Sequence, residues 1–414
     1  MDHGSQISDA RTERGIKLFM IVTALVGLGM GLSDFVLANY FNEAYQITPL
    51  QRGYIEFPRE LPGVIAIFAI GGLAFLGNVR SGIIAQVLAL AGILVLALIR
   101  PDFYIMLIFL FIHSLGTHMY LPIADSIGLS LTKPGSVGRV MGRINSAKMA
   151  SFMVAGLITF LGFRFGAFSF DTPIGIFLFA VIFFALAAVF LVFLYRVIKE
   201  QERAAPKRGL NIVIRKKYLR YYAICALFGG RKQIMLVYSP WVLIYMLGFR
   251  ADTMAVLGMI GAGIGIFFLP VIGRCIDRFG IRRVMVMEAL AFMGVYLAYG
   301  FLSGWINSQQ TVVLTGVMMI LVYILNIVDR MSAQFGIVRS IFLKSIAVSP
   351  DDVTPSIALG MSIDHIFAIS GALICGIIWH NFGPQYVFAI AGLMSFGNML
   401  IARGIKPPAE TVES

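Results

Sequence analysis

Charge and cysteine are the two things this sequence has little of. Charged residues make up 13% of the 414 residues, about half of the share that soluble domains carry. The deficit extends along the whole chain, which excludes a soluble domain with a single membrane anchor. Cys225, Cys275 and Cys375 lie in or beside apolar segments without paired spacing, so they imply neither a disulfide framework nor a zinc site. No nucleophile motif, phosphate-binding loop or filter-like repeat is present, which argues against an enzyme, a receptor or a channel.

Long apolar stretches account for most of the chain, which is 59% hydrophobic. A membrane-spanning helix needs about 20 mostly apolar residues. The predicted fold is therefore an all-α polytopic membrane protein with twelve transmembrane helices. The twelve stretches lie near residues 17–41, 57–77, 82–99, 104–125, 147–166, 174–197, 222–247, 253–273, 284–302, 311–333, 356–378 and 386–403.

The Lys and Arg residues are distributed unevenly over the connections between these spans. The two termini and the even-numbered connections hold 26 of the 33, and the other connections hold 5. Cytoplasmic loops carry the excess of Lys and Arg in membrane proteins. We therefore expect a multi-pass protein of the cell (inner or plasma) membrane with both termini in the cytoplasm. This bias also explains the net charge of +12 without any nucleic-acid partner.

The longest polar connection divides the chain into two halves. It lies near residues 198–221, so the expected organisation is a six-helix half at 1–197, a cytoplasmic linker, and a six-helix half at 222–414. The halves show weak similarity, as in "TPIGIFLFA" at 172–180 and "GPQYVFAIA" at 383–391. A duplicated set of helices is typical of secondary transporters.

The connection between spans eight and nine reads "GRCIDRFGIRR". It resembles the loop motif of the major facilitator superfamily, and the whole chain fits that family's layout. The resemblance implies two pseudo-symmetric six-helix bundles, a central cavity lined by spans 1, 4, 7 and 10, and a gating role for the motif. The sequence departs from the family between spans two and three, where "GGLAFLGNVRSG" has no acid, and span five lacks the proline of many drug antiporters. The matching positions are Gly273, Asp277, Arg278, Gly280, Arg282 and Arg283.

Ionisable residues inside the predicted spans are the candidates for function. A charge at mid-bilayer costs about 2.5–3.5 kcal/mol on insertion scales, so such residues are rare unless they are used. In the resembling family these residues fall on the spans that line or flank the central cavity. The candidates are Asp34, His113, His118, Arg231, Lys232, Asp329, Arg330, Asp364 and His365.

The stretch "GGRKQ" at 229–233 places two cations in one span. If the span began after Lys232, only 234–247 would remain, which is too short to cross. The residues Arg231 and Lys232 differ by about 100° around a helix, so they point at different partners. We expect one of them to bind a substrate anion and the other to pair with a protein carboxylate. The expected substrate-binding residues are Arg231, Lys232, Gln233, Tyr238, Asp34, His113 and Asn326.

Buried carboxylates and histidines are candidates for proton coupling, because burial and neighbouring charges bring their pKa toward neutral pH. Those expected to carry protons are Asp34, Asp364, His365 and His118. In "YIEFPRELPG", Glu56, Arg59 and Glu60 share one helix face, either as a solvated helix start or as an outer gate. Asp329 and Arg330 lie near the predicted inner end of span ten, where they are expected to form an inner gate or a binding site.

The favoured function is a secondary active transporter that moves a small organic solute, anionic or zwitterionic, by alternating access with proton coupling. Efflux of amphipathic compounds or drugs by proton antiport is the alternative. A divalent-metal carrier is a weaker one, because no ligand pair has tight spacing on one helix. The expected partners are the small-molecule substrate, protons and the lipid bilayer, with the chain acting as a monomer without a cofactor.

Overall fold

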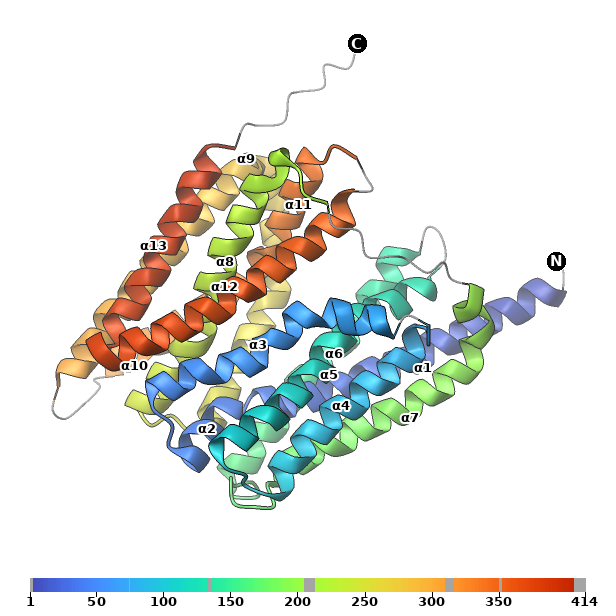
Figure 1. Cartoon of the computed structure of the whole chain (residues 1–414), viewed down its shortest axis with the longest axis horizontal. Helices are drawn as coiled ribbons and strands as arrows, with labels where there is room; N and C mark the ends of the chain where they lie inside the picture. Colours follow the sequence, from blue (N-terminus) through green and yellow to red (C-terminus); the bar gives the residue numbers. More distant parts are fainter. Residues whose placement is uncertain are drawn as a thin grey trace, which may run out of the picture. The chain divides into compact units, whose positions relative to one another are not determined.

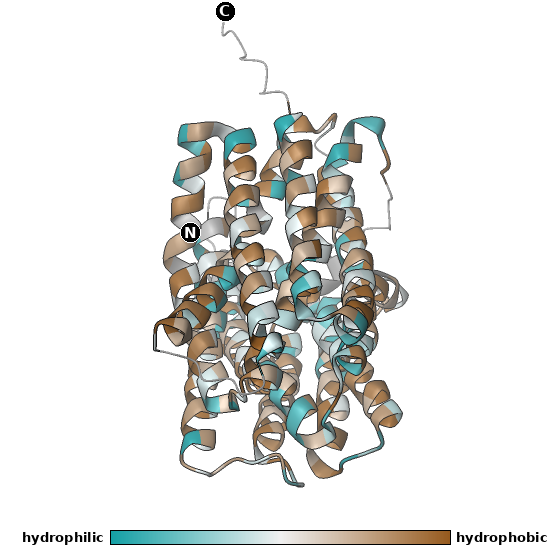
Figure 2. Ribbon diagram, turned by 90° about the vertical axis from the view of Figure 1, so that its left-hand side faces the viewer, coloured by the Kyte–Doolittle hydropathy of each residue, from teal (hydrophilic) through white to brown (hydrophobic). Residues whose placement is uncertain are grey.

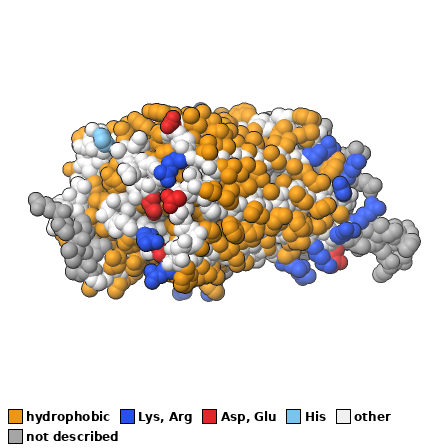
Figure 3. Space-filling view, turned by 90° about the horizontal axis from the view of Figure 1, so that it is seen from below, with side chains coloured by type: hydrophobic (Ala, Val, Ile, Leu, Met, Phe, Trp, Pro, Cys, Tyr) orange, Lys and Arg blue, Asp and Glu red, His pale blue; other side chains and the backbone are white. Residues whose placement is uncertain are grey.

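Helices form most of the described structure, a computed structural model. It describes residues 3–73, 75–132, 136–204, 213–309, 316–349 and 352–405, and no β-strand occurs in these ranges. Apolar residues cover most of each helix (Figure 2). Hydrophobic side chains also cover most of the face seen in Figure 3, where Lys and Arg gather in patches. This is the composition expected of helices that face lipid.

Two compact units share the chain. Unit 1 comprises Met1–Gln46, Leu61–Gly209 and Arg250–Met259, and unit 2 comprises Ile47–Glu60, Leu210–Phe249 and Ile260–Ser414. Ile47–Glu60 belongs to unit 2 although it lies between two segments of unit 1, and Arg250–Met259 belongs to unit 1 although it lies between two segments of unit 2. The two segments lie at the beginning of the second and eighth predicted spans, which are equivalent positions in a duplicated six-helix unit.

Unit 1 is built around helix α1, which packs against α6 and α7, while α4 packs against α5 and α7 (Figure 1). Small residues bring these helices together. A Cβ added at Gly27 would lie 2.8 Å from the Lys148 carbonyl oxygen, so α1 and α6 approach closely there. The helices are α1 (His3–Asp34), α2 (Leu37–Tyr45), α4 (Asn78–Leu98), α5 (Phe103–Ser130), α6 (Val137–Arg164) and α7 (Gly175–Ala204).

Unit 2 is built around helix α8, which packs against α12 and α13 (Figure 1). A buried apolar cluster that includes Tyr218, Ile224, Val284 and Phe342 lies at one end of it. The elements are the first part of α3 (Pro49–Gly72), the 3₁₀ turn η1 (Lys216–Tyr218), α8 (Leu219–Trp241), the π-helical turn η2 (Val242–Met246), α9 (Ala251–Ser308, beginning in unit 1), α10 (Gly316–Met331), the 3₁₀ turn η3 (Ser332–Phe335), α11 (Gly336–Ile346), α12 (Val353–Phe382) and α13 (Pro384–Arg403).

Eight helices among the described residues are long and apolar enough to cross a membrane. The other predicted spans are α3, α8 with η2, the first part of α9, and α10 continued by η3 and α11. Most of these carry the charged residues described below, so a hydropathy window alone does not find them. The twelve-helix fold predicted from the sequence is confirmed.

Several helices extend beyond the predicted spans. Helix α3 begins at Pro49, α6 begins at Val137, and span ten continues through η3 into α11 as far as Ile346. Charges assigned to connections therefore lie on helices.

Candidate functional site

Helix α8 carries the two adjacent cations near its middle. It runs without a break from Leu219 into the π-helical turn that ends at Met246, so the prediction that they lie inside a span is confirmed. Gly229 and Gly230 precede the two cations, and the helix is regular at both. A Cβ at Gly229 would lie 2.7 Å from the Cα of Asp364, so Gly229 serves the close packing of α12 on α8.

Arg231 is paired inside unit 2. Its side chain is 1% exposed, forms an ion pair with Glu288 on α9, and donates a hydrogen bond to Ser395 Oγ on α13 at 3.1 Å. Only one of the two cations was expected to have a carboxylate partner. Both have one, because Glu288 on α9 lies beside Arg231 and Asp364 on α12 lies beside Lys232. With the charge of Arg231 balanced there, we no longer place the substrate at this residue.

Lys232 belongs to a different cluster, in which one carboxylate has two cations. Its Nζ lies 2.8 Å from Asp364 Oδ1, and Arg339 Nη1 lies 3.0 Å from Asp364 Oδ2. The Arg339 guanidinium also lies 3.8 Å from the ring centroid of Phe228, a distance typical of a cation–π contact. We call Lys232, Asp364 and Arg339 the triad. The triad therefore has two positive charges and one negative charge.

Arg339 was not among the candidates from the sequence, because residues 334–355 were predicted to form a connection between two spans. The structure places Arg339 on α11, a helix that follows η3 directly. A signal was present, since Val338, Phe342 and Leu343 recur at helical spacing and are all buried. Such spacing favours an amphipathic helix.

The second cluster lies on the first part of α3. This helix begins earlier than expected because Thr48 and Gln51 cap it reciprocally: Gln51 Oε1 accepts from the Thr48 backbone N–H at 2.9 Å, and Thr48 Oγ1 accepts from that of Gln51 at 3.3 Å. A capping box with proline at the first helical position is a recognisable start signal. Glu56 therefore lies inside the helix and is fully buried, which excludes the solvated helix start.

Ion pairs and hydrogen bonds connect this cluster to α8 and α12. Glu56 accepts from Arg59 at 2.9 Å and from Gln233 Nε2 at 2.6 Å. His365 Nδ1 lies 3.0 Å from Glu60 Oε2, whereas the neighbouring Asp364 pairs with Lys232 and Arg339. Arg52 is a further member of this cluster that was not among the candidates from the sequence. Its guanidinium lies 2.5 Å from the Glu56 carboxylate, and the residue is 4% exposed.

Helix α10 holds Asn326, Asp329 and Arg330. They lie in the last turns of α10, which ends at Met331, and η3 and α11 continue the chain as helix to Ile346. Arg330 Nε donates to Asn326 Oδ1 at 3.0 Å, as expected for neighbours one turn apart, and Asn326 Nδ2 donates to Ser239 Oγ at 3.2 Å. These bonds attach α10 to α8.

Two expected substrate contacts serve packing in this structure. His113 is 4% exposed, and its Nδ1 lies 2.8 Å from the Ala89 carbonyl oxygen on α4. Tyr238 is fully buried and donates to the Ala372 carbonyl at 2.6 Å. Each side chain joins two helices and is too deeply buried in this structure to contact a ligand.

The remaining candidates lie at exposed or half-buried positions. Asp34 is exposed at the last residue of α1, and His118 Nδ1 lies 2.9 Å from the Ser114 carbonyl oxygen. In the loop motif, α9 turns at Gly280, where φ is 77°, a conformation that favours glycine. The charged residues around this turn, Asp277, Arg278, Arg282 and Arg283, are exposed, and Gly273 is half-buried.

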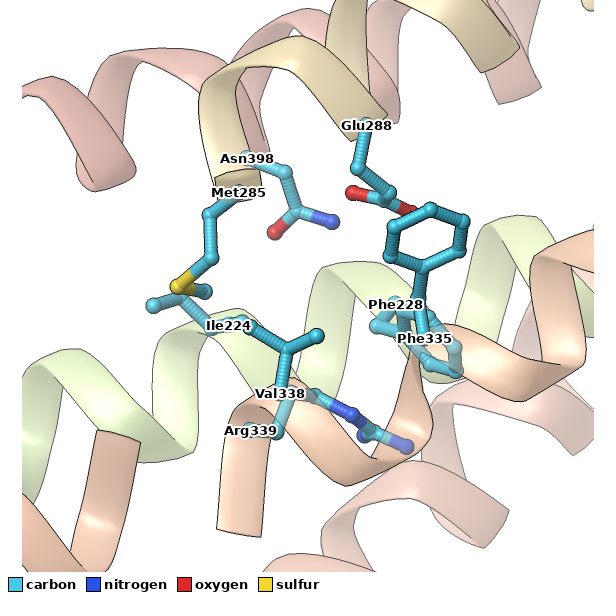
Figure 4. A pocket seen from close by; sticks show the side chains of 8 residues that line it. All are labelled: Ile224, Phe228, Met285, Glu288, Phe335, Val338, Arg339 and Asn398. Atoms are coloured by element: carbon cyan, nitrogen blue, oxygen red, sulfur yellow. The ribbon is translucent and has the colours of Figure 1, made fainter. Parts of the chain in front are cut away.

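One small pocket lies beside the triad. Figure 4 shows the amide of Asn398 and the carboxylate of Glu288 extending toward the space between the helices. The lining also includes Phe228 and Arg339. Its empty volume of ≈ 310 Å³ includes open solvent, and its interior holds about one water molecule. It is too narrow for an organic substrate.

A family model described as Major Facilitator Superfamily matches residues 19–348. The chain belongs to this superfamily. It is therefore a multi-pass membrane transporter and not an enzyme. No curated protein gives a significant match.

Solved transporters share the fold. The nucleoside transporter NupG, in a mutant form, has a TM-score of 0.73 at 16% identity, covering 94% of this chain and 99% of its own. A D-xylose-proton symporter has a TM-score of 0.69 at 15% identity, covering 95% and 98%. A bacterial homologue of the iron transporter ferroportin has a TM-score of 0.69 at 13% identity, covering 94% and 98%. At these identities the likeness extends to the fold alone.

Proposed function

We propose that this transporter moves a small organic anion or zwitterion by alternating access, coupled to protons. The observation that carries the proposal is the triad, in which Lys232 and Arg339 share the single carboxylate of Asp364. The Lys and Arg bias of the connections supports a location in the cell membrane with both termini in the cytoplasm.

The charge of the triad favours an anionic group on the substrate. Asp364 lies on α12, which is long and apolar enough to cross a membrane, where an unbalanced charge is costly. Lys232 and Arg339 keep 24% and 17% of their side chains exposed, so a ligand can reach them. A substrate carboxylate or phosphate would supply the second negative charge, and a guanidinium can bind it through two parallel hydrogen bonds. This moves the proposed anion contact from Arg231 to Lys232 and Arg339.

The pair of His365 and Glu60 is the proposed proton site. Histidine is the side chain used most often for proton transfer near physiological pH, and the Glu60 carboxylate lies 3.0 Å from His365 Nδ1. His365 follows Asp364 directly in the chain, so a proton on the imidazole acts within reach of the triad. The exposed charges around Gly280 are proposed to gate, as the family motif implies.

Proteoliposomes test the proposal. We expect labelled organic anions to accumulate under an imposed pH gradient and to stop accumulating when a protonophore removes the gradient. His365→Gln should keep exchange of substrate across the membrane but lose accumulation driven by the gradient. Uptake that ignores the gradient would contradict proton coupling. Transport restricted to lipophilic cations and drugs would instead favour efflux of amphipathic compounds.

The triad is tested by two single variants. Lys232→Gln and Arg339→Gln should each raise KM about tenfold or more, because a hydrogen bond to a charged group contributes about 1.5–3 kcal/mol. Lys344→Gln is the matched control, since Lys344 is exposed on the same helix as Arg339, and should leave KM unchanged. An unchanged KM in both triad variants would refute the anion site.

A further inference from the structure

Lys148 is a membrane-embedded cation that the proposed function does not use. It lies at the start of the predicted span 147–166, and its charge was counted with the connection before that span. Helix α6 begins at Val137, so Lys148 lies about 16 Å along the helix at 1.5 Å per residue. It lies within Arg139–Arg164, a segment long and apolar enough to cross a membrane, and a lysine inside such a segment is a functional candidate by default.

A pocket opens beside Lys148 within unit 1. Its cavity volume is ≈ 280 Å³, close to the lower end of the range of small-molecule sites, about 300–1,000 Å³. It is lined from α1 by Thr23, Val26 and Met30, from α5 by Tyr120, Leu121, Ala124 and Asp125, and from α6 by Ile144, Asn145 and Lys148.

The polar groups of this pocket have few protein partners. The buried hydroxyl of Tyr120, a residue 3% exposed, has no hydrogen-bond partner among the described residues. Across the same part of the chain, Lys148 has neither a hydrogen bond nor an ion pair within 4.0 Å, although Asp125 and Asp34 act on its charge from farther away. A buried hydroxyl without a partner destabilises the folded state, and a ligand oxygen would relieve this.

We propose that this pocket binds a hydroxylated organic carboxylate. The ammonium of Lys148 meets the carboxylate, the hydroxyl of Tyr120 donates to an oxygen of the ligand, and the carboxylate of Asp125 accepts from a ligand hydroxyl. Thr23 and Asn145 offer further donors and acceptors on the same wall. The apolar side chains of Val26, Met30 and Ile144 contact the carbon skeleton. The inference names a substrate class and so rests on the proposed transport of an organic anion.

Calorimetry on the purified full-length protein in detergent tests this without a membrane gradient. The three probes are gluconate, hexanoate, which keeps the six carbons and the carboxylate but has no hydroxyls, and glucose, which lacks the carboxylate. We expect gluconate to bind and the other two to bind at least about tenfold more weakly, since both kinds of polar contact are needed. Equal binding of gluconate and hexanoate, or no binding of gluconate at millimolar concentration, would overturn the proposal.

Variants locate the site. Lys148→Gln should weaken gluconate binding about tenfold or more, Tyr120→Phe about threefold or more, and Lys148→Arg should restore part of the loss. Lys17→Gln is the matched control, because the Lys17 side chain is 73% exposed in unit 1. Thermal melting shows whether each variant is folded. Wild-type affinity in a folded Lys148→Gln protein would refute the pocket.

The two proposals fail separately. If Arg339→Gln abolishes gluconate binding while Lys148→Gln does not, the unit 1 pocket is wrong and the triad stands. If gluconate binding depends on Lys148 but no anion accumulates under a pH gradient, the pocket stands and proton-coupled transport is wrong.

Discussion

The ion pair of Arg231 and Glu288 allows a direct choice between a structural role and a substrate role. The two side chains are 1% and 8% exposed, so neither charge reaches solvent when its partner is removed. Arg231→Gln leaves the Glu288 carboxylate buried without its cation, and Glu288→Gln leaves the guanidinium with Ser395 alone. We expect both single variants to be strongly destabilised.

The magnitude follows from the cost of an unpaired buried charge. Removing one partner of a buried pair destabilises proteins by about 3–5 kcal/mol. For a unit of roughly 200 residues, each kcal/mol lowers the melting temperature by about 2–4 °C, so each single variant should melt at least about 6 °C below the wild type. The double variant Arg231→Gln/Glu288→Gln has no buried charge, and it should recover most of this loss, because neutral replacements of a buried pair are often tolerated.

Thermal melting of purified protein in detergent, arranged as a double-mutant cycle, measures the coupling. Substrate uptake measured in the double variant completes the test, and uptake should be retained. Wild-type stability in Arg231→Gln, together with complete loss of substrate binding, would refute the reasoning and return Arg231 to the substrate site.

Two further outcomes follow from contacts in unit 2. The hydrogen bonds from Arg215 and Tyr218 lower the pKa of Asp352. Its charged form therefore adds stability above the unfolded pKa of about 3.9, and this is lost as the pH falls through the folded pKa. Asp352→Asn should show a smaller drop in melting temperature between about pH 5 and pH 3 than wild type, and an identical drop would contradict this. Gly53→Ala places a Cβ 2.9 Å from the Ala372 carbonyl oxygen and should cost about 1–3 kcal/mol by overpacking. Gly294→Ala meets nothing within 4 Å and should melt no lower than wild type, whereas equal melting of both glycine variants would refute the close contact.

Pattern and length predicted much of the site. Arg231 and Lys232 were placed inside a span because the remaining residues could not cross a membrane, and their divergence followed from the 100° step of the helix. The ion pair of Glu56 and Arg59 followed from their i, i+3 spacing. These inferences depend on neighbours within one helix, which a sequence specifies directly.

The wrong predictions concern charged residues near the predicted ends of spans. The position of a helix end decides whether such a residue lies in a helix or in a connection. Lys148 and Arg339 were counted with the connections because polar residues near a span were taken to end it. The structure continues α6 and the α10–α11 segment past those points. A charged residue stays in a helix when a partner or a pocket accommodates it, and such partners come from other helices.

The sequence by itself determined the class of this protein. Its scarce charge, long apolar stretches, biased loops and loop motif predicted a twelve-helix transporter, since each is a local property or a sum over the chain. Only the tertiary structure decided which acid meets which cation. Glu288 lies 57 residues from Arg231, Asp364 lies 132 residues from Lys232, and Gln233 lies 177 residues from Glu56. Contacts of this separation depend on how helices pack, and helical spacing alone does not specify them.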